Sequence, residues 1–213
     1  MTGRRYEQVP AMSAVEVRPL RAGELGAAIG VLARGMRDNP GHVAAFGKDP
    51  DRRLDALHRM FSALLTVVQT QQRLCAVRDG VIVGVAVISP LGGCRPSGLQ
   101  KLRIAGHLAG LGARTIGRVV SWHNTWAQRD PDAPHRHVGP IAVDAHAQHQ
   151  GIGSLLLREY VRGLDADRLP GYLETDKPDN VVFYAKHGFE VTGEATVLGR
   201  PHWFMQRQPR EPC

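Results

Sequence analysis

Long apolar runs are missing from this 213-residue sequence. No window approaches the roughly 18–20 uninterrupted apolar residues of a membrane span, and residues 1–10 lack the apolar core of a signal peptide. Cysteine is scarce as well: Cys75, Cys94 and Cys213 are too few and too scattered for a disulfide framework or a zinc cluster. These absences argue against a membrane or disulfide-stapled protein. We therefore expect reduced thiols, a cytoplasmic location and no membrane partner.

Runs of like charge are also missing, although 27 basic residues against 20 acidic ones give a net charge of +7. Only four of the basic residues are lysine, and the basic residues occur singly or in pairs such as Arg52-Arg53. Nucleic-acid-binding proteins usually gather basic residues on one face or in a run. A nucleic-acid partner is therefore not expected, and it is kept only as an alternative.

Local metal-ligand spacing is limited to His135 and His137, which share one face of an extended segment. No carboxylate or thiol joins them at ligand spacing, so no metal is expected. The apolar fraction of 43% and the charged fraction of 22% are ordinary for a globular protein. We expect a disordered leader over residues 1–12, a single domain over 13–208 and a flexible tail over 209–213.

The first half of the chain predicts a strand, two helices and a hairpin. Residues 15–18 alternate as a strand does, and a helical face follows with Leu25, Ala28, Ile29, Leu32 and Met36. Asn39-Pro40-Gly41 is expected to stop that helix, and Asp49-Pro50 to cap the next one. Asp79-Gly80, between the expected strands at residues 73–78 and 81–89, is typical of a type I′ hairpin turn.

Residues 99–127 show helical periodicity in two pieces, and Trp122 and Trp126 fall one turn apart, where we expect them to pack together. The expected core residues of this region are Leu102, Leu108, Leu111, Ile116, Val119, Val120 and Trp126.

From residue 137 onward, strands and helices alternate. Strands are expected at 137–144, 171–176, 189–196 and 201–206, with helices at 151–165 and 179–187. This order predicts an α/β layered sheet. Pro140 has no N–H for the sheet, so we expect the first of these strands to bulge or splay from its neighbour.

The junction at Gly151 and Gly153 is the segment that points to chemistry. An apolar strand ends there, a polar turn follows, and an amphipathic helix begins. Unpaired N–H groups at a helix N-terminus suit a phosphate, and glycine lets an anion come close to the main chain. A Walker loop is excluded because no lysine follows Gly153, and a Rossmann fingerprint because the third glycine is missing.

The motif Gln148-x-x-Gly151-x-Gly153 resembles the signature of the GNAT superfamily of acyl-CoA-dependent N-acyltransferases. The stretch from Asn180 through Tyr184 to Phe189 is similar to a second segment of that family. Residues 172–176 and 203–205 are similar to the branch that contains puromycin N-acetyltransferase. The resemblance implies an α/β (α+β) fold with a mixed, mostly antiparallel sheet, splayed at the middle, with helices on both faces.

The resemblance further implies that acetyl-CoA is the co-substrate. Backbone amides of residues 150–154 would bind its pyrophosphate, and Gln148 would shape the turn. Ile141 and Val143 would pair with the pantetheine arm, and the Val143 N–H would face the thioester carbonyl. The residues expected to bind acetyl-CoA are Ile141, Val143, Gln148, Gln150, Gly151, Ile152, Gly153, Ser154, Asn180 and Tyr184.

Acyl transfer to an amine needs a neutral amine, a stabilised oxyanion and a proton for the departing thiolate. Tyr184 suits the last task because a tyrosine phenol has an ordinary pKa of about 10 and is neutral at pH 7. Glu174, an acidic residue within an apolar strand, is our candidate general base, and His137 is the reserve. Packing for Tyr184 and a backbone contact for Glu174 are the structural alternatives.

Neither Cys75 nor Cys94 has a histidine or carboxylate beside it that could act as a base and activate a thiolate, so direct transfer is preferred to an acyl-cysteine route. The hypothesis is an acetyl-CoA-dependent N-acetyltransferase acting on a primary amine of a small molecule. A peptide or protein N-acetyltransferase and a non-catalytic acyl-CoA-binding or nucleic-acid-binding module are the alternatives. A homodimer is left open.

Overall fold

The computed structural model describes residues 13–92 and 97–210. The leader expected over residues 1–12, Cys94 in segment 93–96, and residues 211–213 with Cys213 therefore lie outside the described residues. Over the described ranges, no helix combines the length and apolar character needed to cross a membrane.

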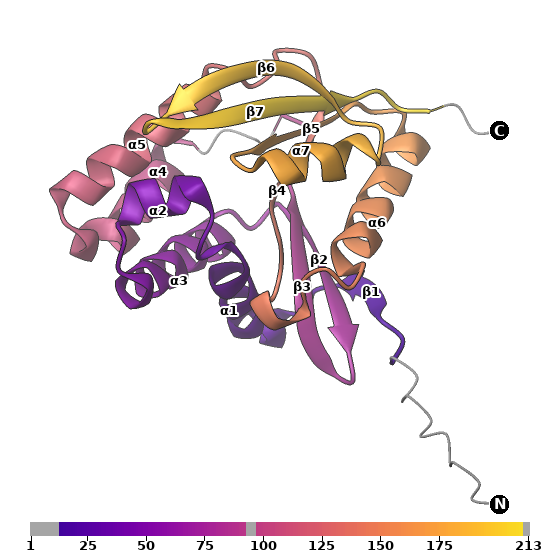
Figure 1. Ribbon diagram of the computed structural model, residues 1–213, viewed down its shortest axis with the longest axis horizontal. Coiled ribbons are helices and arrows are strands. Elements are labelled where there is room, and N and C mark those ends of the chain that lie inside the picture. Colours follow the sequence, from indigo (N-terminus) through magenta and orange to yellow (C-terminus); the bar gives the residue numbers. More distant parts are fainter. Residues whose placement is uncertain (1–12, 93–96, 211–213) are drawn as a thin grey trace, which may run out of the picture.

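Seven strands form one sheet in the order β1-β2-β3-β4-β5-β7-β6 (Figure 1). Among the described strand pairs, β4 and β5 run parallel and all others antiparallel, which confirms the expected mixed, mostly antiparallel sheet. The strands are β1 (Glu16–Pro19), β2 (Gln72–Arg78), β3 (Val81–Ile88), β4 (Arg136–Val143), β5 (Gly171–Thr175), β6 (Glu190–Val197) and β7 (Arg200–Arg207).

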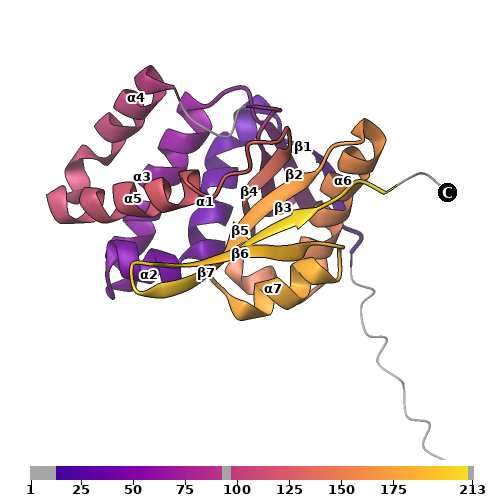
Figure 2. The same ribbon diagram turned by 90° about the horizontal axis from the view of Figure 1, so that it is seen from above.

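Helices cover both faces of the sheet, with α1 to α5 on one side and α6 and α7 on the other (Figure 2). Apolar side chains of α1 and α3 form one core with β2 and β3. Those of α6 and α7 form a second core on the opposite face. The helices are α1 (Leu25–Met36), α2 (Pro40–Phe46), α3 (Pro50–Val67), α4 (Gly98–Leu108), α5 (Ala113–Ala127), α6 (Ile152–Asp167) and α7 (Pro178–Ala185).

Local sequence signals account for two of the junctions. Asp79 and Gly80 both have positive φ, at 51° and 77°, as a type I′ turn requires. The Asp49 carboxylate accepts hydrogen bonds from the backbone N–H groups of Asp51 and Arg52, at 3.1 and 3.2 Å. The expected hairpin and the expected cap of α3 are therefore confirmed.

The expected stop before Asn39-Pro40-Gly41 is confirmed, because α1 ends at Met36 and Pro40 occupies the first turn of a new helix, α2, where its missing N–H is harmless. One expectation was wrong. Leu102 and Val120 are not core residues, since they are 70% and 52% exposed. Leu102 lies on α4 and Val120 on α5. These helices bury only a narrow apolar face, which includes Leu108 and Val119. Trp122 and Trp126 do pack together, with ring centroids 5.2 Å apart.

The sheet splays where Pro140 predicted it. Strands β4 and β5 pair only at Arg136↔Gly171 and His137↔Tyr172, and after these two positions they separate. The register of β4 against β3 also shifts near Pro140, between the partners Ala86 and Ile88. The splay leaves the second half of β4 unpaired on one side, next to the start of α6.

Candidate active site

A row of backbone N–H groups lies at the start of α6. Over the described residues, none of the N–H groups of residues 150–154 donates a hydrogen bond, and the first helical bond runs from Leu155 to the Gly151 carbonyl. Gly151 has φ of 80°, and a Cβ at this position would meet nothing within 4 Å. The main chain here is therefore open to an anion, and the helix dipole favours one.

Gln148 holds this loop to two other elements. Its Nε2 donates to the carbonyls of Gly35 on α1 and Val143 on β4, at 3.1 Å each. Gly35 permits the contact, because a Cβ there would lie 2.3 Å from the Val143 carbonyl oxygen. The loop conformation thus depends on α1, which lies far away in the sequence.

Two arginines bring positive charge to the same loop. Arg34 Nη2 lies 2.5 Å from the Asp144 carboxylate. Burial alone would raise the pKa of Asp144, but Arg34 outweighs it, so that the pKa lies below its usual value. Arg78, at the end of β2, donates from Nη1 to Gln150 Oε1 at 2.7 Å. Its Nε and Nη2 are buried without a hydrogen-bond partner among the described residues.

Helix α7 closes the other side of the loop. A Cβ at Gly153 would lie 3.5 Å from the Phe183 ring and 3.8 Å from Val143 Cγ2, so α6, α7 and β4 meet at this point. Asn180 Nδ2 donates to Thr175 Oγ1 at 3.1 Å. Asn180 therefore ties the start of α7 to the end of β5.

Tyr184 on α7 is 5% exposed and packs against Phe183 and Phe189. Burial raises the pKa of its phenol well above the usual value, and the carboxylates of Asp176 and Glu174 raise it further. The phenol is therefore protonated over the whole neutral range. Over the described residues, no hydrogen bond occupies the hydroxyl group.

Glu174 and His137 lie together at the point where β4 and β5 separate. His137 Nε2 is 2.7 Å from Glu174 Oε2, and the Glu174 side chain is 5% exposed. Along β5, Tyr172 and Glu174 point to the same face, because side chains alternate along a strand. Tyr172 Oη donates to the Arg129 carbonyl just after α5, so this is the face that α5 covers.

The unpaired edge of β4 faces the splay. The Asp144 N–H donates to the Val83 carbonyl on β3, at 2.9 Å. Since successive N–H groups of a strand point to opposite sides, those of Val143 and Ile141 point away from β3. The site thus combines free N–H groups at α6, an extended edge at β4, a buried phenol from one face and a carboxylate–imidazole pair on the other.

These residues fit a coenzyme A thioester. The open main chain at Gly151 and the neighbouring Arg78 suit a diphosphate, and the free edge of β4 suits an amide-bearing arm. No three His, Cys, Asp or Glu side chains come together as a metal site in the described ranges.

Comparison with known protein families identifies the family of this chain. A family model described as an acetyltransferase (GNAT) domain matches residues 70–191, more than half of the chain. The chain belongs to the GNAT acetyltransferase family. It is accordingly an acetyl-CoA-dependent acyltransferase, and the GNAT fold expected from the Gln148–Gly153 motif is confirmed.

Solved structures share this GNAT fold at low sequence identity. A protein from Corynebacterium glutamicum, described as histone acetyltransferase HPA2 and related acetyltransferase, is 20% identical, with a TM-score of 0.69 over 94% of this chain and 99% of its own. The ribosomal-protein-S18-alanine N-acetyltransferase of Escherichia coli is 13% identical (TM-score 0.55; 94% and 97% covered). The PaiA N-acetyltransferase of Thermoplasma acidophilum, solved with coenzyme A, is 13% identical (TM-score 0.52; 92% and 99%).

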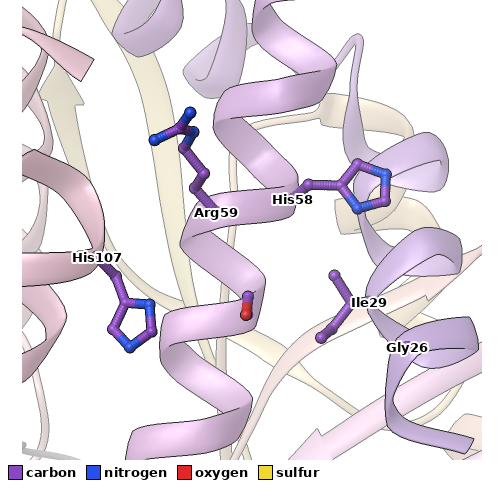
Figure 3. A pocket seen from close by; sticks show the side chains of 6 residues that line it. Gly26, Ile29, His58, Arg59 and His107 are labelled. Atoms are coloured by element: carbon purple, nitrogen blue, oxygen red, sulfur yellow. The ribbon is translucent and has the colours of Figure 1, made fainter. Parts of the chain in front are cut away.

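An open hollow of about 510 Å³ lies elsewhere, on the surface of α1, α3 and α4. Ile29 and His58 line one side of α3, and His107 lies on the other (Figure 3). None of its lining residues comes from β4, β5, α6 or α7. Cys75 is likewise remote from the site: it is buried in the core of α1 and α3, and burial raises the pKa of its thiol.

Sequence reasoning missed three contacts of the site. The Asp176 carboxylate accepts from the Gly41 N–H of α2 at 2.5 Å. The Arg34–Asp144 pair and the Arg78–Gln150 bond join residues more than 70 positions apart. No local pattern could reveal them, whereas the register of β4 and β5 would have brought His137 towards Glu174.

Proposed function

We propose that the protein transfers the acetyl group of acetyl-CoA directly to a primary amine of a small molecule. The observation that carries the proposal is the arrangement around the splay. A protonated, buried phenol approaches from the α7 face, and a carboxylate–imidazole pair lies on the α5 face. Acid and base on opposite sides of one opening are what direct transfer from thioester to amine needs.

Bound acetyl-CoA would supply the thioester that the transfer consumes. The N–H groups of residues 150–154, with Arg78 beside them, would hold its diphosphate. The edge of β4 from Ile141 to Val143 would pair with its arm, and the Val143 N–H would stabilise negative charge on the carbonyl oxygen.

Acetyl transfer needs one group that accepts a proton and one that donates a proton, and these groups lie on opposite faces of the sheet. Glu174, oriented by His137, would take the proton that the ammonium group loses. The amine nitrogen then forms its bond to the carbonyl carbon as the carbon–sulfur bond breaks. Tyr184 would give its proton to the departing sulfur and regain one from solvent.

The packing of helix α5 over the proposed base Glu174 supports a small molecule as the acceptor. Helix α5 packs against α2 and β6 through Trp122, Ala45 and Val197, so the α5 face of the splay is walled by side chains from three elements. Peptide and protein acetyltransferases need a groove that is open at both ends. If the protein acetylated peptides of a test panel but none of the small amines, the acceptor would be a peptide or protein and not a small molecule.

Tyr184→Phe tests the acid. Turnover should fall by about 10²-fold or more, while calorimetric titration should give an unchanged affinity for acetyl-CoA, because the ring and its packing remain. Unchanged turnover would assign Tyr184 to packing alone.

Glu174→Gln tests the base. The rate at pH 7 should fall by about 10²-fold and recover as the pH approaches the pKa of the amine, because more of the acceptor is then neutral without help. Glu190→Gln, an exposed carboxylate on β6, is the matched control and should change neither the rate nor the pH profile. A loss that persists at high pH would contradict a role as base.

A further inference from the structure

A cluster of histidine and tryptophan rings lines the α5 face beside the proposed base. It consists of His42 on α2, Trp122 and Trp126 on α5 and His202 on β7, and we call it the His–Trp cluster. Trp122 lies 5.1 Å from His42 and 5.9 Å from His202, measured between ring centroids, and Trp126 lies 5.9 Å from His202. The four rings therefore form one continuous contact among three elements.

Each ring of the His–Trp cluster has a buried nitrogen without a hydrogen-bond partner among the described residues. These atoms are His42 Nδ1, Trp122 Nε1, Trp126 Nε1 and His202 Nε2. His42, Trp122 and His202 are all more than nine-tenths buried. A buried polar group left unpaired costs about 1–3 kcal/mol, and more than about 90% of such groups are paired in native proteins. Four in one cluster indicate a polar occupant.

The chemistry of the four nitrogens defines that occupant. An indole N–H can only donate, so Trp122 and Trp126 need acceptors. Burial lowers the pKa of His42 to about 4, so its ring is neutral and offers a lone pair on one nitrogen. His202 Nδ1 lies 3.2 Å from the Arg200 carbonyl oxygen and donates to it, which leaves Nε2 to face the occupant. The occupant must both accept and donate hydrogen bonds.

The His–Trp cluster is continuous with the proposed base. On paired strands, Glu174 lies opposite Phe204, and His202 lies two residues from Phe204 on the same face. Asp176 follows directly after β5, and a Cβ at Gly41 would lie 2.9 Å from Asp176 Oδ2 and 3.2 Å from the Trp122 ring. An acceptor whose nitrogen reaches Glu174 would extend its body along Asp176 towards these rings.

We propose that the His–Trp cluster selects amines that carry hydroxyl or amide groups on the body of the molecule. This inference rests on the proposed acetyl transfer to a small amine. A hydroxyl or amide group both donates and accepts, and so can serve the indole N–H groups and the lone pair of the His42 ring together. The protonated nitrogens of a polyamine only donate and would leave both indoles unpaired, so the cluster disfavours polyamines.

Matched amines test the selection through thiol release from acetyl-CoA. Glucosamine is compared with cyclohexylamine, ethanolamine with propylamine, and putrescine and spermidine represent polyamines. The oxygenated member of each pair should have kcat/KM higher by about tenfold or more, because a site built for a hydroxyl group rejects its deoxy analogue. In Trp126→Phe, which keeps a ring but loses the N–H, that ratio should fall towards one through KM, with KM for acetyl-CoA unchanged.

Trp203→Phe is the matched control, because Trp203 lies on the opposite face of β7 from His202. The ratio between oxygenated and plain amines should stay as in the wild type. The variant also leaves Trp122 and Trp126 as the remaining tryptophans. Its fluorescence therefore reports on the cluster alone and should change saturably with glucosamine and not with spermidine, whether or not transfer occurs.

Thiol release and tryptophan fluorescence together distinguish failure of the proposed selection from failure of the proposed acetyl transfer. Thiol release at equal rates for both members of each pair, with unchanged fluorescence, would mean that water alone occupies the four nitrogens and would overturn the selection while leaving acetyl transfer intact. A saturable fluorescence change without thiol release from any amine would support the cluster as a binding site and overturn the proposed transfer. Absence of both responses would overturn both.

Discussion

Gly35 offers a sharp test of how the fold shapes the cofactor loop, because at this residue α1 lies directly against the backbone of β4. A Cβ at this position would lie 2.3 Å from the Val143 carbonyl oxygen and 3.1 Å from Ala142 Cβ. Carbon–oxygen contacts are favourable only from about 3.3 Å outward. Helix α1 of the Gly35→Ala variant would therefore have to retreat by about 1 Å.

The magnitude follows from three opposing effects. Replacing glycine by alanine inside a helix stabilises by about 1 kcal/mol. Overpacking against backbone costs about 1–3 kcal/mol, and loss of the Gln148 bond to the Gly35 carbonyl costs about 1 kcal/mol more. The net expectation for Gly35→Ala is destabilisation by about 1–3 kcal/mol. Acetyl-CoA should also bind about fivefold more weakly or worse, because Gln148 holds the loop.

Urea denaturation and calorimetric titration with acetyl-CoA measure the two effects. Gly26→Ala is the matched control in the same helix, since a Cβ there would meet nothing within 4 Å. It should stabilise by up to about 1 kcal/mol and leave the affinity unchanged. A Gly35→Ala variant as stable as Gly26→Ala, with wild-type affinity, would refute the argument that this close approach shapes the loop.

Two further predictions concern backbone conformation and pH. Gly151→Ala should destabilise the protein by about 1 kcal/mol, because φ at this position is 80°, and calorimetry should show weaker binding of acetyl-CoA. Gly163→Ala, within α6, is the control: its Cβ would make only an ordinary contact at 3.7 Å, so it should neither destabilise the protein nor weaken the binding. Burial lowers the pKa of His42 to about 4, despite the opposing effect of Asp176. The unfolded chain therefore binds a proton that the folded one does not between about pH 6.5 and 4. Stability should fall by about 3 kcal/mol as the pH drops through this window, and urea titrations of His42→Phe should show a flatter profile; equal slopes would contradict a buried neutral His42.

Much of the fold could be read from local patterns. The hairpin at Asp79-Gly80, the cap at Asp49 and the splay at Pro140 each depend on conformational limits that a few residues carry with them. The α4–α5 region was harder. Its helices bury only a narrow face, and Leu102 and Val120 lie outside that face and are exposed.

The sequence by itself determined the loop that begins α6. Its two glycines and the helix that follows specify the free N–H groups, since both are properties of a short segment. Only the tertiary structure decided what surrounds that loop. Gly35 and Arg78 come from distant elements, because strand register and helix packing bring together residues that lie far apart along the chain. The open main chain of the cofactor loop is thus carried by a local motif, whereas the His–Trp cluster is assembled by contacts among α2, α5 and β7.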